Sequence, residues 1–591
     1  MRSGLRGNGN RSLIFQFTPS AFESLAGVIG NLKTDPLKWH QKNKPDPFSK
    51  LKKQYPEKNH PHPNFNNEEM KNEESSQHSE HMHQHGGGMA SRGVTRPMMM
   101  GQQMDQEQQG EHGSHEQHGQ DHKMTTERRM QMLHMHHMQT LWIYWMLVML
   151  GIWLILSPLT FSYGKSTVDP SGGRELWLSL ADRIRFMKWS DIISGVLLLF
   201  FGWRSLTPDR PVSVWICCFI GVWLSIAPII FWAPSAGVYI NDTLVGILVI
   251  SLTILIPGMP NMIMFMKMGS EVPAGWSYNP SSWPQRWIMI ILGFAGWLVS
   301  RYLGAFQLGY IDFAWDPFFG ESTRQVLNSD MSQSLPVSDG SFGALAYTLE
   351  FLMGWMGGTS RWRTMPWMVA LFGILVIPLG LVHIFLVISQ PVAVGAWCTM
   401  CLLAASIMLP MIPLEVDEVI AMGQHMVLAK RRGDSLWNVF WKGGMPIEPN
   451  TDKRSPEMME FPAQPIKIFK ASVWGMSCPW TLLVSAVIGV WMMFSPAVFG
   501  VSIQASAANI NHLSGALIVV IAVICMGEVL RRGRFFNVLI GLIVAVGPWF
   551  VNDSNLTLNI NGAAAGFLVI LLSIPRGPKK EQYGLWDKYV K

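Results

Sequence analysis

Twelve apolar segments, each long enough or nearly long enough to cross a bilayer, constrain this 591-residue chain more than any other feature. Only 15% of its residues are charged, although the first fifth is very polar. The pattern predicts an all-α polytopic membrane protein, in which helices satisfy their own backbone polar groups within the lipid bilayer. The net charge of +6 is small for this length, and we expect no nucleic-acid partner. The segments lie at about 140–163, 189–206, 212–233, 238–258, 287–308, 341–358, 365–389, 390–413, 474–499, 509–530, 534–551 and 561–576.

The polar N-terminal region, residues 1–138, is predicted to be a disordered cytoplasmic tail, because it has too few branched apolar residues to offset the entropy of ordering. It holds fourteen of the seventeen histidines, several of them beside methionine, a pairing that suits copper. The candidate ligands are His81, His83, His85, His134, His136 and His137. The alternative is a polar tract that binds metals only weakly, and we predict no firm metal site because disorder supplies no fixed coordination geometry.

Four of the apolar segments carry one template, Gly-x-Trp-x-x-x-Ser-Pro, the last in a degenerate form. Each is followed by a segment with Asp or Asn four or five residues before a glycine. We expect the proline to end the first helix, the Asp or Asn to cap the second, and small residues to let the two pack closely. The repeat therefore predicts two pairs of helical hairpins, at 139–259 and 474–577. The template residues are Gly151, Trp153, Ser157 and Pro158; Gly221, Trp223, Ala227 and Pro228; Gly489, Trp491, Ser495 and Pro496; and Gly541, Ile543, Gly547 and Pro548, with Asp191/Gly195, Asn241/Gly246, Asn511/Gly515 and Asn561/Gly566 following them.

Basic residues in the short connections set the expected orientation. With twelve spans and a cytoplasmic N-terminus, most of the basic connections fall on the cytoplasmic side. The chain is thus predicted to be an integral multi-pass protein of the bacterial plasma membrane, with both termini cytoplasmic, a cytoplasmic linker at 414–473 and a basic tail at 578–591. The residues concerned are Arg204, Arg210, Arg361, Arg363, Arg531, Arg532, Arg534, Arg576, Lys579 and Lys580. The exception is 164–188, which we interpret as holding an interfacial amphipathic helix.

The central unit, 287–413, lacks the repeat and holds Cys398 and Cys401, two residues apart at a predicted helix start. Such a pair can close a disulfide or present a nucleophilic thiol. Its neighbours are apolar, which favours exchange with a lipid-soluble quinone. The assigned topology puts the pair toward the outer face, where a disulfide persists. The four other cysteines are interpreted as buried free thiols.

Ionisable residues within the apolar segments are costly in lipid and call for partners. Arg301 and Glu350 lie on consecutive antiparallel segments and are predicted to form an ion pair that locks two helices, in preference to a proton path. His383 is a candidate proton donor to a reducing quinone, and a hydrogen bond to a neighbouring helix explains it equally well. Asp312 and Asp316 are interpreted as parts of a solvated loop.

Two resemblances follow from these motifs. The hairpins resemble the SPW repeat family, which implies no activity. The central four segments resemble the vitamin K epoxide reductase family of membrane thiol–quinone oxidoreductases. The resemblance implies that Cys401 reacts with quinone, that Cys398 exchanges with a thiol donor, that Asp339 contacts the quinone oxygen, and that Ser329 belongs to a loop serine motif. It rests on Val326 to Ser329, Ser341-Phe342-Gly343, Tyr347-Thr348-Leu349, Gly354 and Trp397-Cys398-Thr399-Met400-Cys401.

Departures from that family leave two readings open. The loop 309–340 lacks the two relay cysteines of the family, the second of which would fall at Thr323. Where the family has an aromatic residue that contacts the quinone, this chain has Ala405. Where the family has an amide side chain that contacts the quinone, this chain has the acid Asp339. We expect a thiol–quinone oxidoreductase that uses ubiquinone, menaquinone or a similar quinone, with a thioredoxin-like partner attacking Cys398 directly. The alternative is a non-catalytic membrane scaffold or copper-handling protein built on the repeats.

Overall fold

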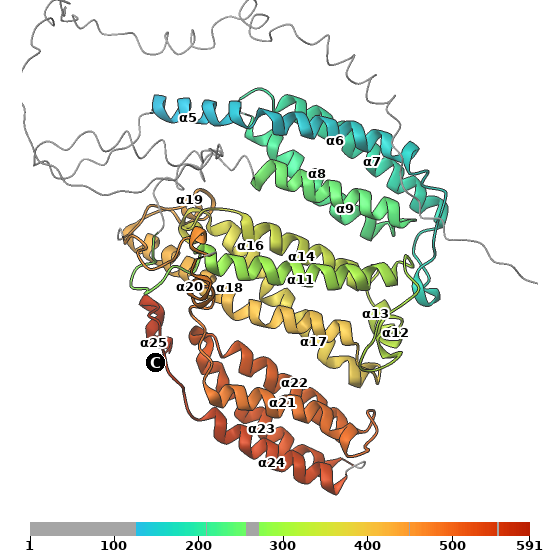
Figure 1. Cartoon of the computed structure of the whole chain (residues 1–591), viewed down its shortest axis with the longest axis vertical. Helices are drawn as coiled ribbons and strands as arrows, with labels where there is room; N and C mark the ends of the chain where they lie inside the picture. The colour runs from blue at the N-terminus through green and yellow to red at the C-terminus, as the bar shows by residue number, and fades with distance from the viewer. Residues whose placement is uncertain are drawn as a thin grey trace, which may run out of the picture. The chain divides into compact units, whose positions relative to one another are not determined.

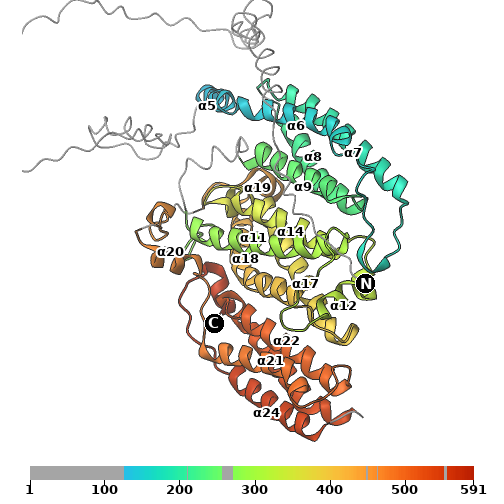
Figure 2. The ribbon, with the colours of Figure 1, turned by 45° about the vertical axis from the view of Figure 1, so that its right-hand side comes forward.

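The computed structural model describes residues 126–590 apart from 209, 256–270, 448–449, 462 and 552–554. Within these ranges the chain is helical, with three isolated β-bridges and no strand (Figures 1 and 2). Ten of the described helical segments are long and apolar enough to span a membrane. The prediction of an all-α membrane protein is confirmed. His81, His83 and His85 lie outside the described residues.

The first hairpin pair consists of α6 (Leu141–Thr160), α7 (Leu180–Arg204), α8 (Pro211–Ile230) and α9 (Ala236–Ile250), the last extended by a π-helical turn at Ser251–Leu255. These helices lie side by side in both views (Figures 1 and 2). Helix α7 begins well before the predicted residue 189, because Ser179 caps it by accepting a hydrogen bond from the Asp182 amide. The predicted interfacial helix is therefore partly the first turns of α7.

The second pair repeats the arrangement with α21 (Trp480–Val498), α22 (Ser506–Ile524), α23 (Phe536–Val546) and α24 (Leu556–Ser573). The proline of the template lies near the end of the first helix in each of the first three hairpins, and in the fourth it lies just beyond α23. These ends agree with the expectation that proline does not continue a helix.

Glycines of the template face each other in all four hairpins, as predicted. A Cβ atom added to Gly195 would lie 2.7 Å from the Gly151 carbonyl oxygen, and one added to Gly515 would lie 2.6 Å from that of Gly489. Gly246 with Gly221 and Gly566 with Gly541 make the same approach. The backbones of each hairpin thus touch directly, which is how membrane helices gain dispersion energy without a hydrophobic driving force.

The Asp and Asn residues of the repeat are not helix caps, and that prediction is wrong. They lie inside the second helices because these start a turn or more earlier than expected. Two of them link hairpins instead: the Trp153 indole donates to Asn241 Oδ1 over 2.8 Å, and the Trp491 indole donates to Asn561 Oδ1 over 2.9 Å. The tryptophan of the template therefore joins two hairpins into one unit.

Between these units lie α11 (Trp283–Gln307), α14 (Asp339–Trp355), α16 (Pro366–Val376) with α17 (Pro378–Ala393), and α18 (Thr399–Arg432). The end of this bundle where α11 stops and α14 and α18 begin is called the disulfide end, and the other is called the opposite end. Helix α18 continues through residue 414, where a linker is predicted, because Glu415, Asp417 and Glu418 turn into the protein and are buried.

Short helices cover both ends of the bundle. At the disulfide end they are α12 (Ser322–Leu327) and α13 (Asp330–Gln333). At the opposite end they are α15 (Arg361–Thr364), α19 (Leu436–Lys442) and α20 (Pro465–Ser472). Directly before α6, residues Thr126–Gln139 form α5, so the described end of the tail that was predicted to be disordered is helical.

The C-terminal segment returns to the start of the central unit at the opposite end. Tyr583 is fully buried, its ring lies edge-on to Trp276, and its hydroxyl donates to Glu528 over 3.1 Å. Arg454 pairs with Glu581 over 2.5 Å, and the Gln582 amide donates to Ser277. Helix α25 (Asp587–Val590) follows. The predicted basic tail is thus part of the packed structure.

Candidate functional site

Cys398 and Cys401 form a disulfide at the first turn of α18. Cys398 is the N-cap residue, and its sulfur accepts a hydrogen bond from the Cys401 amide over 3.0 Å. The Gln390 side chain holds the backbone that leads into α18, because it accepts a hydrogen bond from the Cys398 amide over 3.1 Å. A helix N-terminus and an amide donor both stabilise a thiolate, so Cys398 is prepared to carry negative charge once the disulfide opens.

Access to the disulfide is restricted. Cys398 is 0% exposed and Cys401 8% exposed, and both pack with Val326, Leu327 and Val387 in an apolar cluster. The covering residues come from α12 in the loop between α11 and α14, and from α17. No solvent therefore reaches Cys398 while these residues cover it.

Asp316 clamps the loop onto the disulfide segment. One carboxylate oxygen accepts from the Thr399 hydroxyl, and the other accepts from the Thr323 amide over 2.9 Å and from its hydroxyl over 2.7 Å. The Thr323 hydroxyl oxygen in turn accepts from the Thr399 amide over 3.1 Å. Asp312 is exposed, as expected of a solvated loop, whereas Asp316 is only partly exposed because donors far apart in sequence converge on it.

The hydrogen bonds of the clamp favour the ionised form of Asp316. Partial burial acts to raise the pKa of Asp316, but the hydrogen bonds from Thr399, Phe319 and Thr323 outweigh it and lower that pKa. A depressed pKa in the folded state means that the carboxylate stabilises the closed loop above its ordinary pKa, and that this contribution is lost as the pH falls through the folded-state pKa.

We expect Asp316→Ala to speed reduction of the Cys398–Cys401 disulfide by dithiothreitol about 3- to 10-fold, because a hydrogen-bonded carboxylate that holds the loop closed is removed. The rate is read by quenching with a maleimide and counting labelled cysteines. Asp312→Ala is the matched control, because Asp312 is an exposed acid in the same loop. Equal rates for the two variants would show that Asp316 does not control access.

The second hairpin pair forms one wall of the site. Trp397, beside the disulfide, lies edge-on to His512 of α22 with ring centroids 5.8 Å apart. Phe319 of the covering loop stacks on Phe494 of α21 at 6.5 Å. The repeat is therefore in direct contact with both the disulfide segment and its cover.

Asp339 and Ser329, the polar residues expected near the quinone, form hydrogen bonds with residues of the covering loop and its ends. Asp339 accepts hydrogen bonds from Gln307, from the Ser332 hydroxyl over 3.0 Å and from the Gly340 amide over 2.8 Å. Ser329 is the N-cap of α13, and its hydroxyl donates to the Val326 carbonyl over 2.7 Å. Both residues hold the covering loop in place.

His383 lies on α17 against Tyr347, with the rings edge-on and their centroids 6.4 Å apart. Tyr347 is buried and donates to the Ala404 carbonyl over 3.1 Å, one turn of α18 beyond Cys401. His383 therefore contacts a side chain that reaches α18 one turn beyond Cys401.

The predicted ion pair between Arg301 and Glu350 is wrong. Arg301 donates to the Thr243 hydroxyl of α9 over 2.9 Å and lies over the Tyr239 ring, so it joins the central unit to the first hairpin pair. Neither carboxyl oxygen of Glu350 has a hydrogen-bond partner in the described part of the chain. The two side chains leave their helices toward different neighbours.

The sequence reasoning missed Thr399 and Gln390 as well as Asp316. A glutamine near the end of an apolar segment, eight residues before Cys398, was the available signal for Gln390. Within the described ranges, no group of three or more His, Cys, Asp or Glu side chains is placed to hold a metal ion. His137 of the proposed ligands instead contacts the Leu206 carbonyl oxygen at 3.1 Å.

Comparison with known proteins gives two matches. A model of the Vitamin K epoxide reductase family matches residues 287–416, and the SPW repeat domain matches residues 175–255 and 479–575. No curated protein and no solved structure matches the chain.

Proposed function

Because residues 287–416 form a vitamin K epoxide reductase family domain between two SPW repeat domains, we propose that this membrane protein oxidises an external dithiol and passes the electrons to a quinone. Proteins of that family use quinones as substrates. The observation that carries the proposal is the buried Cys398–Cys401 disulfide at the first turn of a membrane helix. Both the helix N-terminus and the apolar surroundings suit the chemistry.

In the first half-reaction a partner thiolate attacks Cys398 Sγ. The Cys398–Cys401 bond breaks, Cys401 leaves as a thiolate, and a mixed disulfide forms between Cys398 and the partner. The second partner thiol attacks the partner sulfur of this mixed disulfide. The partner departs as a disulfide, and Cys398 is released as a thiolate next to the Cys401 amide.

In the second half-reaction the Cys401 thiolate adds to the quinone ring. The Cys398 thiolate then attacks Cys401 Sγ, which re-forms the disulfide, and the electron pair of the breaking carbon–sulfur bond stays on the ring. Two protons complete the quinol. We assign His383 to proton donation, supported by its contact with Tyr347. Asp339 and Ser329 are assigned to positioning the loop.

The thiol partner acts on Cys398 without an internal relay. The loop has no cysteine, and Thr323, whose hydroxyl oxygen accepts from the Thr399 amide, occupies the place of the second relay residue. We propose a thioredoxin-like partner on the outer face of the membrane, with both chain termini on the cytoplasmic side. Binding of the partner would displace the loop that Asp316 holds.

The test is differential alkylation of Cys398 and Cys401 in native membranes, with decylubiquinone as the probe quinone. We expect dithiothreitol to reduce the pair and the quinone to reoxidise it, with one quinol formed per disulfide. Cys525, a buried thiol of the second repeat domain, is the internal control and should not change state.

A pair that stays reduced whatever quinone is added would contradict the proposal. The scaffold function would then be the better description, with the SPW repeat domains as the working part.

A further inference from the structure

Two buried carboxyl groups in the central unit take no part in the chemistry described so far. Glu350 on α14 is 1% exposed and Glu415 on α18 is 2% exposed. In the described ranges, both carboxyl oxygens of Glu350 lack a hydrogen-bond partner, and so does the Oε1 atom of Glu415. An ionised carboxylate without a donor or cation costs several kcal/mol in such a place. The neutral carboxylic acid is the form that this site accommodates, and it carries a proton at membrane depth.

The two groups are spaced along the membrane normal. Glu350 lies about 16 Å from the start of α14, and Glu415 about 24 Å from the start of α18, at 1.5 Å per residue. Both helices begin at the disulfide end. In a hydrocarbon core of about 30 Å, Glu350 is therefore near the middle and Glu415 toward the opposite end.

Toward the disulfide end, Glu350 is one helical turn from Tyr347. The Tyr347 hydroxyl donates to the Ala404 carbonyl, and its ring contacts His383. Ala404 is three residues beyond Cys401. Protonatable side chains thus continue from Glu350 to the turn of α18 that follows Cys401.

Toward the opposite end, Glu415 is within electrostatic reach of Glu350, Glu418, Asp417 and Arg361. Glu418 is paired with Arg361 over 2.6 Å. Successive members of the series Cys401, Glu415, Glu418 and His425 are 14, 3 and 7 residues apart, so each lies within about 60° of the one before it around α18. The series therefore forms a stripe that winds by about 120° around the helix.

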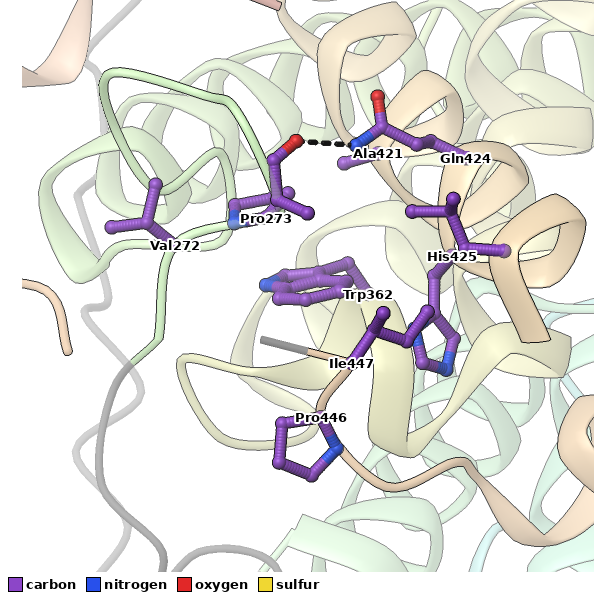
Figure 3. Close-up of a pocket in the computed structure, with 10 residues that line it drawn as sticks. Val272, Pro273, Trp362, Ala421, Gln424, His425, Pro446 and Ile447 are labelled. Atoms are coloured by element: carbon purple, nitrogen blue, oxygen red, sulfur yellow. Dashed lines mark hydrogen bonds between the residues drawn. The ribbon is translucent and has the colours of Figure 1, made fainter. Parts of the chain in front are cut away.

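The stripe ends at a pocket. His425 lines it together with Trp362, Gln424, Pro273 and Ile447 (Figure 3). Gln424 is occupied, because its amide donates to the Ala274 carbonyl over 2.6 Å. His425 is 3% exposed, and its Nε2 atom has no hydrogen-bond partner among the described residues. Trp362, edge-on to the His425 ring at 5.5 Å, directly follows Arg361 in the chain.

We propose that Glu415 and Glu350 conduct the protons of quinone reduction from the opposite side of the membrane. The inference rests on the proposed function. Per turnover, the two thiols release two protons at the disulfide end, the quinone accepts the electron pair, and two protons arriving through Glu350 complete the quinol. The net result is two protons taken up on one side and two released on the other.

The experiment uses the full chain in vesicles of phosphatidylethanolamine and phosphatidylglycerol, with a pH dye inside and decylubiquinone in the bilayer. A charged, reduced dithiol peptide that does not cross the bilayer is added outside, so only molecules with the disulfide end outward react. Valinomycin and K⁺ prevent a membrane potential. We expect the interior to lose two protons per quinol. In Glu350→Gln and Glu415→Gln, we expect at least a fivefold smaller loss per quinol.

Asp417→Asn is the matched control, because Asp417 is a buried carboxyl of similar depth that lies about 200° around α18 from Glu415, where its Oδ2 atom accepts from Tyr278 over 2.6 Å. Its Oδ1 atom has no partner among the described residues, as for Oε1 of Glu415, so the two differ in position and not in burial. It should keep the wild-type proton uptake. Reduction of the disulfide by the peptide needs no proton from this path and checks that each variant is folded. Quinol formation without interior proton loss in the wild type, or wild-type proton loss in both glutamine variants, overturns the inference alone. Absence of quinol formation overturns the proposed function as well.

Discussion

Replacing Cys401 with serine is expected to lower quinone reduction by a dithiol at least about 1,000-fold, because a hydroxyl is not a nucleophile at neutral pH and cannot close the disulfide again. The measurement is decylubiquinone absorbance in purified protein with dithiothreitol, corrected for the uncatalysed reaction. Cys525→Ser serves as the control, since it removes a buried free thiol at the end of α22 away from the disulfide segment. A Cys401→Ser enzyme as fast as the wild type would exclude the mechanism.

The variant of the other cysteine, Cys398→Ser, separates the roles of the two cysteines. Cys401 remains able to add to quinone, but no thiolate is left to displace the ring. We therefore expect turnover to stop with a quinone mass on Cys401, detectable by mass spectrometry of the intact chain. An adduct on another cysteine would show that Cys401 is not the inner nucleophile.

The second large effect concerns stability. Arg361 and Glu418 form a bidentate pair in which both guanidinium contacts measure 2.6 Å, and Arg361 is 1% exposed. Arg361→Met leaves Glu418 buried without its cation, and we expect a loss of about 3–5 kcal/mol in the free energy of unfolding. Denaturant titration in detergent measures it.

The double variant Arg361→Met with Glu418→Leu is the control for that prediction. Replacing both charges by apolar groups of similar size is often nearly neutral, so the double variant should recover most of the stability. A double variant as unstable as the single one would show that the hydrogen bonds from Arg361 to the Met353 and Met356 carbonyls dominate instead.

Features repeated along the chain were predictable from sequence, and contacts between distant segments were not. The glycine spacing of the hairpins and the position of the cysteine pair at a helix start follow from local pattern. The prediction of an Arg301–Glu350 ion pair was wrong because periodicity shows on which face of a helix a residue lies, but not which neighbouring helix that face contacts. Arg361 and Arg363 were counted as loop charges that orient the chain, yet both are buried, paired with Glu418 and Glu271.

The clamp shows the same limit within the site. Asp316, Thr323 and Thr399 span more than eighty residues, and none has an unusual local setting. Only the fold brings them together. Burial of Glu415 and Glu418 was likewise hidden, because a charged stretch after an apolar segment is typical of a helix leaving the membrane.

The return of the C-terminal segment to Trp276 and Ser277 has a consequence for biosynthesis. Domains generally fold as the chain emerges from the ribosome, N-terminal parts first. The opposite end of the central unit cannot reach its final packing, however, until Glu581 and Tyr583 have been synthesised. Insertion of the last hairpins therefore precedes completion of a domain whose coding region, residues 287–416, ends 165 residues before residue 581. A ribosome stalled before residue 581 would hold that domain unfinished in the bilayer.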